Sequence, residues 1–277
     1  MARYFARSIR NAVVLSVTCS AVMVHSFSNA AEEQLWKNVQ SAGVLRCGAA
    51  VAAPYVMRDP MTSEYSGFFS DLCRNFGEKI LKVKVEFVDT NWDNLIAGLQ
   101  SKKWDLAMGL NETPERAMAI AFSAPAADDQ TTLLINKDNP KFAAAGNRIQ
   151  DYDKEGVNIV VMAGTSQEKA ISAVVKKATI LRLPGLDETR LAVITRRGDI
   201  IADSSDTNRM FAAANKDWAR EIKLDPPLAK QGVSFGLRRD VSPADLQVLN
   251  IFITQLREAG EIDKAINAAT VAEVSSK

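Results

Sequence analysis

The chain has 277 residues, of which 47% are hydrophobic and 24% are charged, and its formal net charge is +1. This composition excludes a disordered chain and leaves room for one large domain or two medium-sized ones. The 34 basic residues barely outnumber the 33 acidic ones, so we expect no nucleic-acid partner.

The first 30 residues follow the order of a secretory signal peptide. Three arginines precede an apolar stretch, and small residues stand at positions −3 and −1 of a cut after Ala30. We expect cleavage after Ala30 and a periplasmic location. An uncleaved membrane anchor is the weaker alternative, because the apolar stretch is short for a bilayer span. A lipoprotein cut before Cys19 is weaker still, since Ser16 and Thr18 depart from the usual pattern.

Cleavage would remove His25, the only histidine of the chain. A mature chain without histidine cannot host a Ser-His-Asp site, a Cys-His site or a His-ligated zinc, so we expect neither metal nor cofactor. Catalysis by carboxylates or lysine stays open. Cys47 and Cys73 would remain, either as a disulfide, which an exported protein with an even cysteine count favours, or as two buried thiols.

Strands and helices alternate along the chain in two series. In the first, apolar runs predict strands at 45–51, 83–88 and 105–110, and helical spacing predicts helices at 69–80 and near 95–99. A loop at 138–146 separates the second series, which has strands at 157–162, 179–183 and 200–202 and helices at 167–178 and 188–195. A final helix runs from an N-cap at Ser242 to Gly260. This order predicts two α/β lobes, which bind ligands at the carboxyl ends of their strands.

Three stretches place polar residues where a predicted strand ends. In the first, Thr113 caps a helix that carries Arg116 in its first turn, and the planar guanidinium of Arg116 suits a ligand carboxylate. A surface ion pair of Arg116 with Glu112 or Glu115 explains the pattern equally well.

The second stretch is Gly164-Thr165-Ser166, which also opens a helix. Free N–H groups at a helix N-terminus bind anions, although a plain helix cap accounts for the same residues. The third stretch is 200–206, at the end of a predicted strand. Its Asp203 or Asp206 could accept a hydrogen bond from an ammonium group or could cap a helix. Trp92 stands where a loop meets a helix and could stack on a ligand or pack in the core.

An ordered set of short motifs resembles the bacterial extracellular solute-binding proteins, family 3, the periplasmic receptors of amino-acid ABC transporters. The resemblance covers about residues 43–262. The motifs in chain order are Gly43-Val44-Leu45-Arg46, Gly67-Phe68, Asp71-Leu72, Trp92 with Leu95-Ile96 and Leu99-Gln100, Thr113 with Glu115-Arg116, Phe122-Ser123-x-Pro125, Gly164-Thr165 and Gly260.

The resemblance implies an α/β fold of the type II periplasmic binding protein class, with two lobes, two hinge strands and a ligand cleft between the lobes. After a signal peptide at 1–30, lobe one would comprise 31–126 plus 230–277, and lobe two 127–229. Arg116 would bind the α-carboxylate of the ligand, together with backbone N–H groups and hydroxyls of Thr165 and Ser166.

The α-ammonium group, by the same resemblance, would be held by the carbonyl of Gly109, by Asn111 and by an aspartate of lobe two. We expect Asp203 to be this aspartate, because a strand at 200–202 would direct it into the cleft, and Asp206 is the alternative. Trp92 would lie where the family often has a stacking aromatic residue.

These expectations predict a monomeric periplasmic receptor that captures an amino acid or a related small carboxylate by lobe closure. It would deliver this ligand to the permease subunits of an ABC transporter and would not be an enzyme. One alternative is a dehydratase-like enzyme on the same fold, with Glu112, Asp203 or Lys169 as acid or base. Another is a partner-docking subunit of a periplasmic oxidoreductase or sensor.

Overall fold

The structure, a computed structural model, describes residues 34–275. The predicted signal peptide, with its cut after Ala30, Cys19 and His25, lies outside the described residues. None of the helices within residues 34–275 has the length and the apolar character that a membrane span requires. The same part of the chain contains no group of three or more His, Cys, Asp or Glu side chains that could hold a metal ion.

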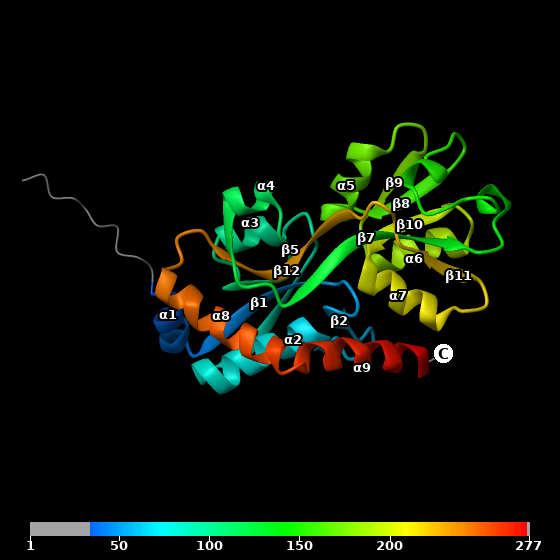
Figure 1. Cartoon of the computed structure of the whole chain (residues 1–277). Coiled ribbons are helices and arrows are strands. Elements are labelled where there is room, and N and C mark those ends of the chain that lie inside the picture. The colour runs from blue at the N-terminus through cyan, green and yellow to red at the C-terminus, as the bar shows by residue number, and fades with distance from the viewer. Residues whose placement is uncertain (1–33, 276–277) are drawn as a thin grey trace, which may run out of the picture. The chain divides into compact units, whose positions relative to one another are not determined.

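A continuous path of hydrogen-bonded strands organises the fold, in the order β4-β1-β5-β12-β7-β10-β8-β9. The strands on each flank run parallel to one another. The two central strands, β7 (Ala127–Asn136) and β12 (Leu228–Arg238), are antiparallel to each other and to their flanking neighbours. Figure 1 shows these long strands side by side between the two groups of shorter strands. They are the two hinge strands of a type II periplasmic binding fold.

The first group of elements comes from both ends of the chain. Its parallel strands are β1 (Val44–Ala50), β4 (Lys84–Thr90) and β5 (Leu106–Asn111). Three short strands accompany them: β2 (Met57–Arg58), β3 (Tyr65–Ser66) and β6 (Ile120–Phe122). The helices are α1 (Leu35–Ala42), α2 (Phe68–Asn75), α3 (Leu95–Gln100), α4 (Pro114–Ala119), α8 (Pro243–Glu258) and α9 (Glu261–Ser275), with a π-helical turn over Phe76–Leu81.

The second group is the middle of the chain. Its strands are β8 (Asn158–Met162), β9 (Thr179–Leu183), β10 (Ile200–Ser204) and β11 (Ala219–Ile222). Its helices are α5 (Ser166–Val174), α6 (Leu186–Ile194) and α7 (Ser205–Ala214), with short 3₁₀ turns at Pro140–Phe142 and Ile149–Asp151. The predicted alternation of strands and helices in two series is confirmed. The exact lobe boundaries, 126/127 and 229/230, stay a prediction; the first precedes β7 and the second falls near the start of β12.

The structure differs from the sequence expectations at the end of β10 and after α8. Strand β10 runs to Ser204 rather than ending at 202, and α7 follows it directly. The final helix does end near Gly260, which has a φ of +69°, but α9 then continues to Ser275. Helix α9 contacts α8 and α2 of the first group and also α7 of the second.

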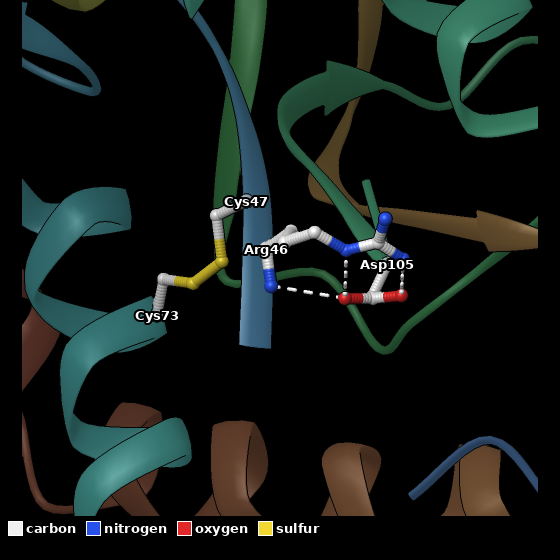
Figure 2. The surroundings of a disulfide bond; sticks show 4 residues. All are labelled: Arg46, Cys47, Cys73 and Asp105. Atoms are coloured by element: carbon white, nitrogen blue, oxygen red, sulfur yellow. Dashed lines mark hydrogen bonds and ion pairs between the residues drawn. A yellow bond between two sulfur atoms is a disulfide. The ribbon is translucent and has the colours of Figure 1, made fainter. Parts of the chain in front are cut away.

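Two features of β1 tie the first group together (Figure 2). Side chains alternate across a strand, so Cys47 points to one face of β1 and Arg46 to the other. Cys47 forms a disulfide with Cys73 of α2, with the two Cα atoms 6.9 Å apart. Arg46 forms a two-pronged ion pair with Asp105, with N–O distances of 2.7 and 3.1 Å. We propose that the exported protein contains this disulfide. By the loss of chain entropy in the unfolded state, a disulfide that closes a loop of this length stabilises the fold by about 3 kcal/mol.

Candidate ligand-binding site

Arg116 is buried at the carboxyl end of β5, with only 5% of its surface exposed. Thr113 caps α4 by accepting a hydrogen bond from the backbone N–H of Arg116, which fixes the residue in the first turn. Nη1 donates to the carbonyl of Asn111 at 3.1 Å and Nη2 to the carbonyl of Gly164 at 3.2 Å. Burial lowers the pKa of Arg116 to about 10, because desolvation disfavours the charged form. The surface ion pair with Glu112 or Glu115 is therefore not the arrangement in this structure.

Asp129 of the hinge strand β7 is a buried carboxylate that the sequence expectations missed; 3% of its surface is exposed. Its Oδ2 accepts hydrogen bonds from Asn111 Nδ2 at 3.1 Å and Gln167 Nε2 at 3.0 Å. Its Oδ1 accepts from the Ser204 hydroxyl and from the backbone N–H and hydroxyl of Ser205, at 2.9 to 3.0 Å. Burial raises the pKa of Asp129, and these hydrogen bonds oppose the shift by stabilising the carboxylate.

Among residues 34–275, five charged side chains are buried: Asp105, Arg116, Asp129, Asp203 and Asp206. Two of these form ion pairs, Asp105 with Arg46 and Asp206 with Arg209, and the charge of Arg190 acts on Asp203 from a longer distance. Within the described residues, no ion pair within 4.0 Å joins Arg116 or Asp129 to a side chain of opposite charge. Asn111 contacts both, because its carbonyl accepts from Arg116 and its amide donates to Asp129. One unpaired positive and one unpaired negative charge thus lie on either side of Asn111.

The start of α5 lies beside this pair of charges. The Thr165 hydroxyl accepts from the N–H of Glu168 and donates to the carbonyl of Met162, so it works as a helix cap. The Ser166 hydroxyl donates to Gln167 Oε1 at 3.1 Å and accepts from Gln231 Nε2 of β12 at 3.1 Å. The structure thus brings Ser166 into the network of Asn111 and Asp129 through Gln167, and uses Thr165 to position the helix.

Trp92 and Gly164 meet where the two groups of elements touch. Gly164 has a φ of +77°, and a Cβ added there would lie 2.8 Å from the backbone nitrogen of Asp93 and 3.0 Å from the carbonyl carbon of Trp92. The Trp92 indole is buried and donates to the carbonyl of Val51 at 3.3 Å. Trp92 therefore lies next to the predicted site, and its neighbour Asp93 is exposed.

Tyr55, which the sequence expectations also missed, reaches from the first group to the second. Its hydroxyl donates to Asp206 Oδ2 at 3.0 Å and lies 3.0 Å from the Ser204 hydroxyl. Burial raises the pKa of Tyr55 well above its usual value, and the nearby carboxylates add to the shift. Gly109 has a φ of +69°, and a Cβ added there would lie 3.9 Å from Tyr55 Cβ and 3.8 Å from Phe69 Cδ2. Tyr55 thus supplies an aromatic side chain beside the end of β5.

The two candidate aspartates of the second group are placed differently from the expectation. Ile201 belongs to a core cluster with Val193 of α6, and strand alternation puts Asp203 on the same face, where the charge of Arg190 acts on it. Burial raises the pKa of Asp203 to about 7. Asp206, in the first turn of α7, is the one that contacts Tyr55. Because β10 extends to Ser204, the geometry does not support Asp203 as an acid that faces the cleft.

A cavity of about 250 Å³ opens at the hinge next to this network. Asp129 and Ser205 line it, as do Arg209 and the exposed residues Lys223 and Lys230. Both ammonium groups are in contact with water, which screens their effect on buried charges.

Residues 45–269 match the family model of the bacterial extracellular solute-binding proteins, family 3. The chain belongs to this family. Among curated relatives, it is 27% identical over 205 residues to the "Probable histidine-binding protein" of Campylobacter jejuni, covering 74% of this chain and 76% of the relative. It is 30% identical over 176 residues to the cyclohexadienyl dehydratase of Pseudomonas aeruginosa, covering 62% of this chain and 63% of the relative.

A solved structure agrees with the fold. The chain resembles the crystal structure of an ancestral amino acid-binding protein, described as a precursor of cyclohexadienyl dehydratase, with a TM-score of 0.74 and 29% identity. This match covers 85% of this chain and 98% of that one. The relatives of this chain within family 3 thus include both binding proteins and an enzyme.

Proposed function

We propose that the chain is a receptor for an α-amino acid or a related small carboxylate and delivers it to the permease subunits of an ABC transporter. The observation that carries the proposal is the pair of buried, unpaired charges, Arg116 and Asp129, on either side of Asn111. An α-amino acid carries a carboxylate and an ammonium group on one carbon and so complements both charges. Burying such a zwitterion is favourable only when both of its charges find partners.

In this proposal, Arg116 binds the α-carboxylate with the first N–H groups of α5 and the Ser166 hydroxyl. The carbonyl of Gly109 and the side chain of Asn111 hold the α-ammonium. Asp129 supplies the negative charge that the sequence analysis expected from Asp203. Thr165 positions the start of α5, and Trp92 closes one side of the site.

Lobe closure is the proposed mode of capture, and contacts between the two groups of elements support it. The Arg116–Gly164 and Tyr55–Asp206 hydrogen bonds both join residues of different groups, as does the 2.6 Å bond from the Thr207 hydroxyl to the carbonyl of Ala53. A ligand that binds residues of both lobes stabilises the closed state, because those interactions exist only there.

The proposed compartment is the periplasm, reached by export and cleavage after Ala30, and the proposed working form is a monomer. The family is one of extracellular proteins, which supports export. Mass spectrometry of the intact exported chain tests the cleavage site, since a cut after Ala30 leaves Ala31 as the first residue. A retained N-terminal segment would contradict it.

We further propose binding without turnover, although one relative is a dehydratase. Each candidate acid or base either makes a hydrogen bond within the protein or lies at the surface. Glu112 accepts from the Ser234 hydroxyl at 2.5 Å, Asp203 accepts from the N–H of Ser204, and Lys169 is exposed. Incubation with aromatic and aliphatic amino acids, followed by mass spectrometry, should return them unchanged. Detection of a dehydrated product would contradict this proposal and show that the chain is an enzyme.

The direct test is calorimetric titration with a panel of amino acids and small carboxylates, for the native chain and for Arg116→Lys. Lysine keeps the charge but loses the planar fork, so affinity should fall roughly 10- to 150-fold, the equivalent of a charged hydrogen bond. Arg257→Lys is the matched control, since Arg257 pairs with Asp128 at the surface. The proposal fails if nothing in the panel binds, or if Arg116→Lys binds as tightly as Arg257→Lys.

A further inference from the structure

We infer that the ligand of this site is an amino acid with an uncharged side chain. The inference rests on the proposed function and adds the class of ligand. Of the five buried charges in the described part of the chain, Asp105 and Asp206 form ion pairs, and Asp203 lies on the Ile201 face of β10 in the field of Arg190. Arg116 and Asp129 are the two buried charges that remain at the site. The α-carboxylate and the α-ammonium of one amino acid use both. A third charge on the ligand would find no unpaired buried charge of opposite sign at this site.

The other buried carboxylates of the second group are already engaged. Asp206 pairs with Arg209 and accepts a hydrogen bond from Tyr55. Asp203 lies in the field of Arg190 and accepts from the N–H of Ser204. Neither is free to neutralise a cationic ligand side chain without giving up an existing partner. Asp93 lies near Gly164 but is exposed, so water screens its charge.

The segment that follows β1 lies beside β5 and is mostly apolar. The segment after β1 carries Ala52, Ala53 and Tyr55, and no acid occurs between Val44 and Arg58. These three residues are buried in one cluster with Phe69, and the cluster also includes Met162 from the end of β8. This segment therefore supplies dispersion contacts and the hydroxyl of Tyr55, but no negative charge. Uncompensated burial of an ammonium, guanidinium or carboxylate is costly in such surroundings.

The test uses pairs of amino acids that have nearly the same shape but different charge. The probes are citrulline against arginine, norleucine against lysine, and glutamine against glutamate, each titrated calorimetrically into the full exported chain. In every pair with measurable binding, the neutral member should bind at least ~10-fold more tightly, because a single unmatched buried charge costs more than that ratio. Tighter binding of arginine, lysine or glutamate than of its neutral counterpart would overturn the inference while leaving the proposed function intact. If no α-amino acid binds, the inference fails, and the proposed function fails with it only if no small carboxylate binds either.

A pair of variants tests whether Asp129 balances the charge of the ligand's ammonium group. Asp129→Asn removes the unpaired carboxylate, and Asp128→Asn is the matched control, because Asp128 is the exposed neighbour that pairs with Arg257. Asp129→Asn should weaken the best-bound neutral amino acid of the panel at least ~10-fold, whereas Asp128→Asn should leave it unchanged. Equal affinities in both variants would show that Asp129 does not balance the ammonium group. Should Asp129→Asn fail to fold, the three pairs on the native chain still decide the inference.

Discussion

Replacing Gly164 by alanine tests lobe closure at the point where the two groups of elements touch. A methyl group there would lie 2.5 Å from Asp93 Oδ1, 2.8 Å from the Asp93 nitrogen and 3.0 Å from the Trp92 carbonyl carbon. The carboxylate can rotate away, but the backbone atoms cannot. In the proposed mechanism this collision occurs only when the lobes are closed, so Gly164→Ala should penalise the ligand-bound state selectively.

The magnitude follows from two separate costs. The positive φ of Gly164 costs an alanine about 1–2 kcal/mol, and this cost is paid whether the lobes are open or closed. The overpacking against Asp93 and Trp92 adds about 1–3 kcal/mol in the closed state. Only the second cost affects binding, so affinity should fall roughly 5- to 140-fold. The hydrogen bond from Arg116 to the Gly164 carbonyl would weaken in the same variant.

Gly156→Ala is the matched control, because Gly156 has a similar φ of +74° and no atom within 4 Å of an added Cβ. Both variants are compared with the native chain by thermal unfolding without ligand and by calorimetric titration with the best-bound amino acid. The two variants should lose similar stability, and Gly164→Ala alone should lose affinity. Equal affinities in the two variants would refute closure of Trp92 and Asp93 onto Gly164.

Three further predictions concern single groups. Tyr55→Phe should weaken ligand binding roughly 2- to 10-fold, the value of a hydrogen bond between lobes, and unchanged calorimetric affinity would speak against that contact. Burial raises the pKa of Asp203 to about 7, so the folded state favours the protonated carboxyl group. The stability that this group contributes is therefore complete below pH 3.8 and is lost as the pH rises through 7. Asp203→Asn should therefore flatten the fall in unfolding free energy between pH 5 and 8 by up to about 3 kcal/mol, and an unchanged slope in denaturant titrations would contradict the assignment. Thiol titration of the denatured exported chain should detect no free thiol, and reduction of Cys47–Cys73 should lower stability by about 3 kcal/mol; a full count of two thiols would exclude the bridge.

Much of the site's framework can be predicted from local sequence. Thr113-Pro114 and Thr165 each cap the helix that follows a buried strand, and a cap needs only residues within one turn. Arg116 is therefore placed by its own neighbours. Asp129 also left a local signal, because strand alternation puts it on the same face of β7 as the buried Ala127 and Thr131.

The partners of these residues could not be predicted, since they come from distant segments. The Tyr55–Asp206 hydrogen bond joins residues 151 positions apart, and the Asp129–Ser205 bond joins residues 76 apart. The choice between Asp203 and Asp206 depended on where β10 ends, and pairing with β7 carries that strand to Ser204. Neither strand length nor distant pairing is encoded within a few residues.

The sequence by itself determined the alternation of strands and helices, the two capped helix starts and the position of Arg116, because periodicity and capping act over short distances. Only the tertiary structure decided which buried charges find partners. Burial and pairing are set by how β5, β7 and β10 meet, and that arrangement leaves Arg116 and Asp129 unpaired on either side of Asn111.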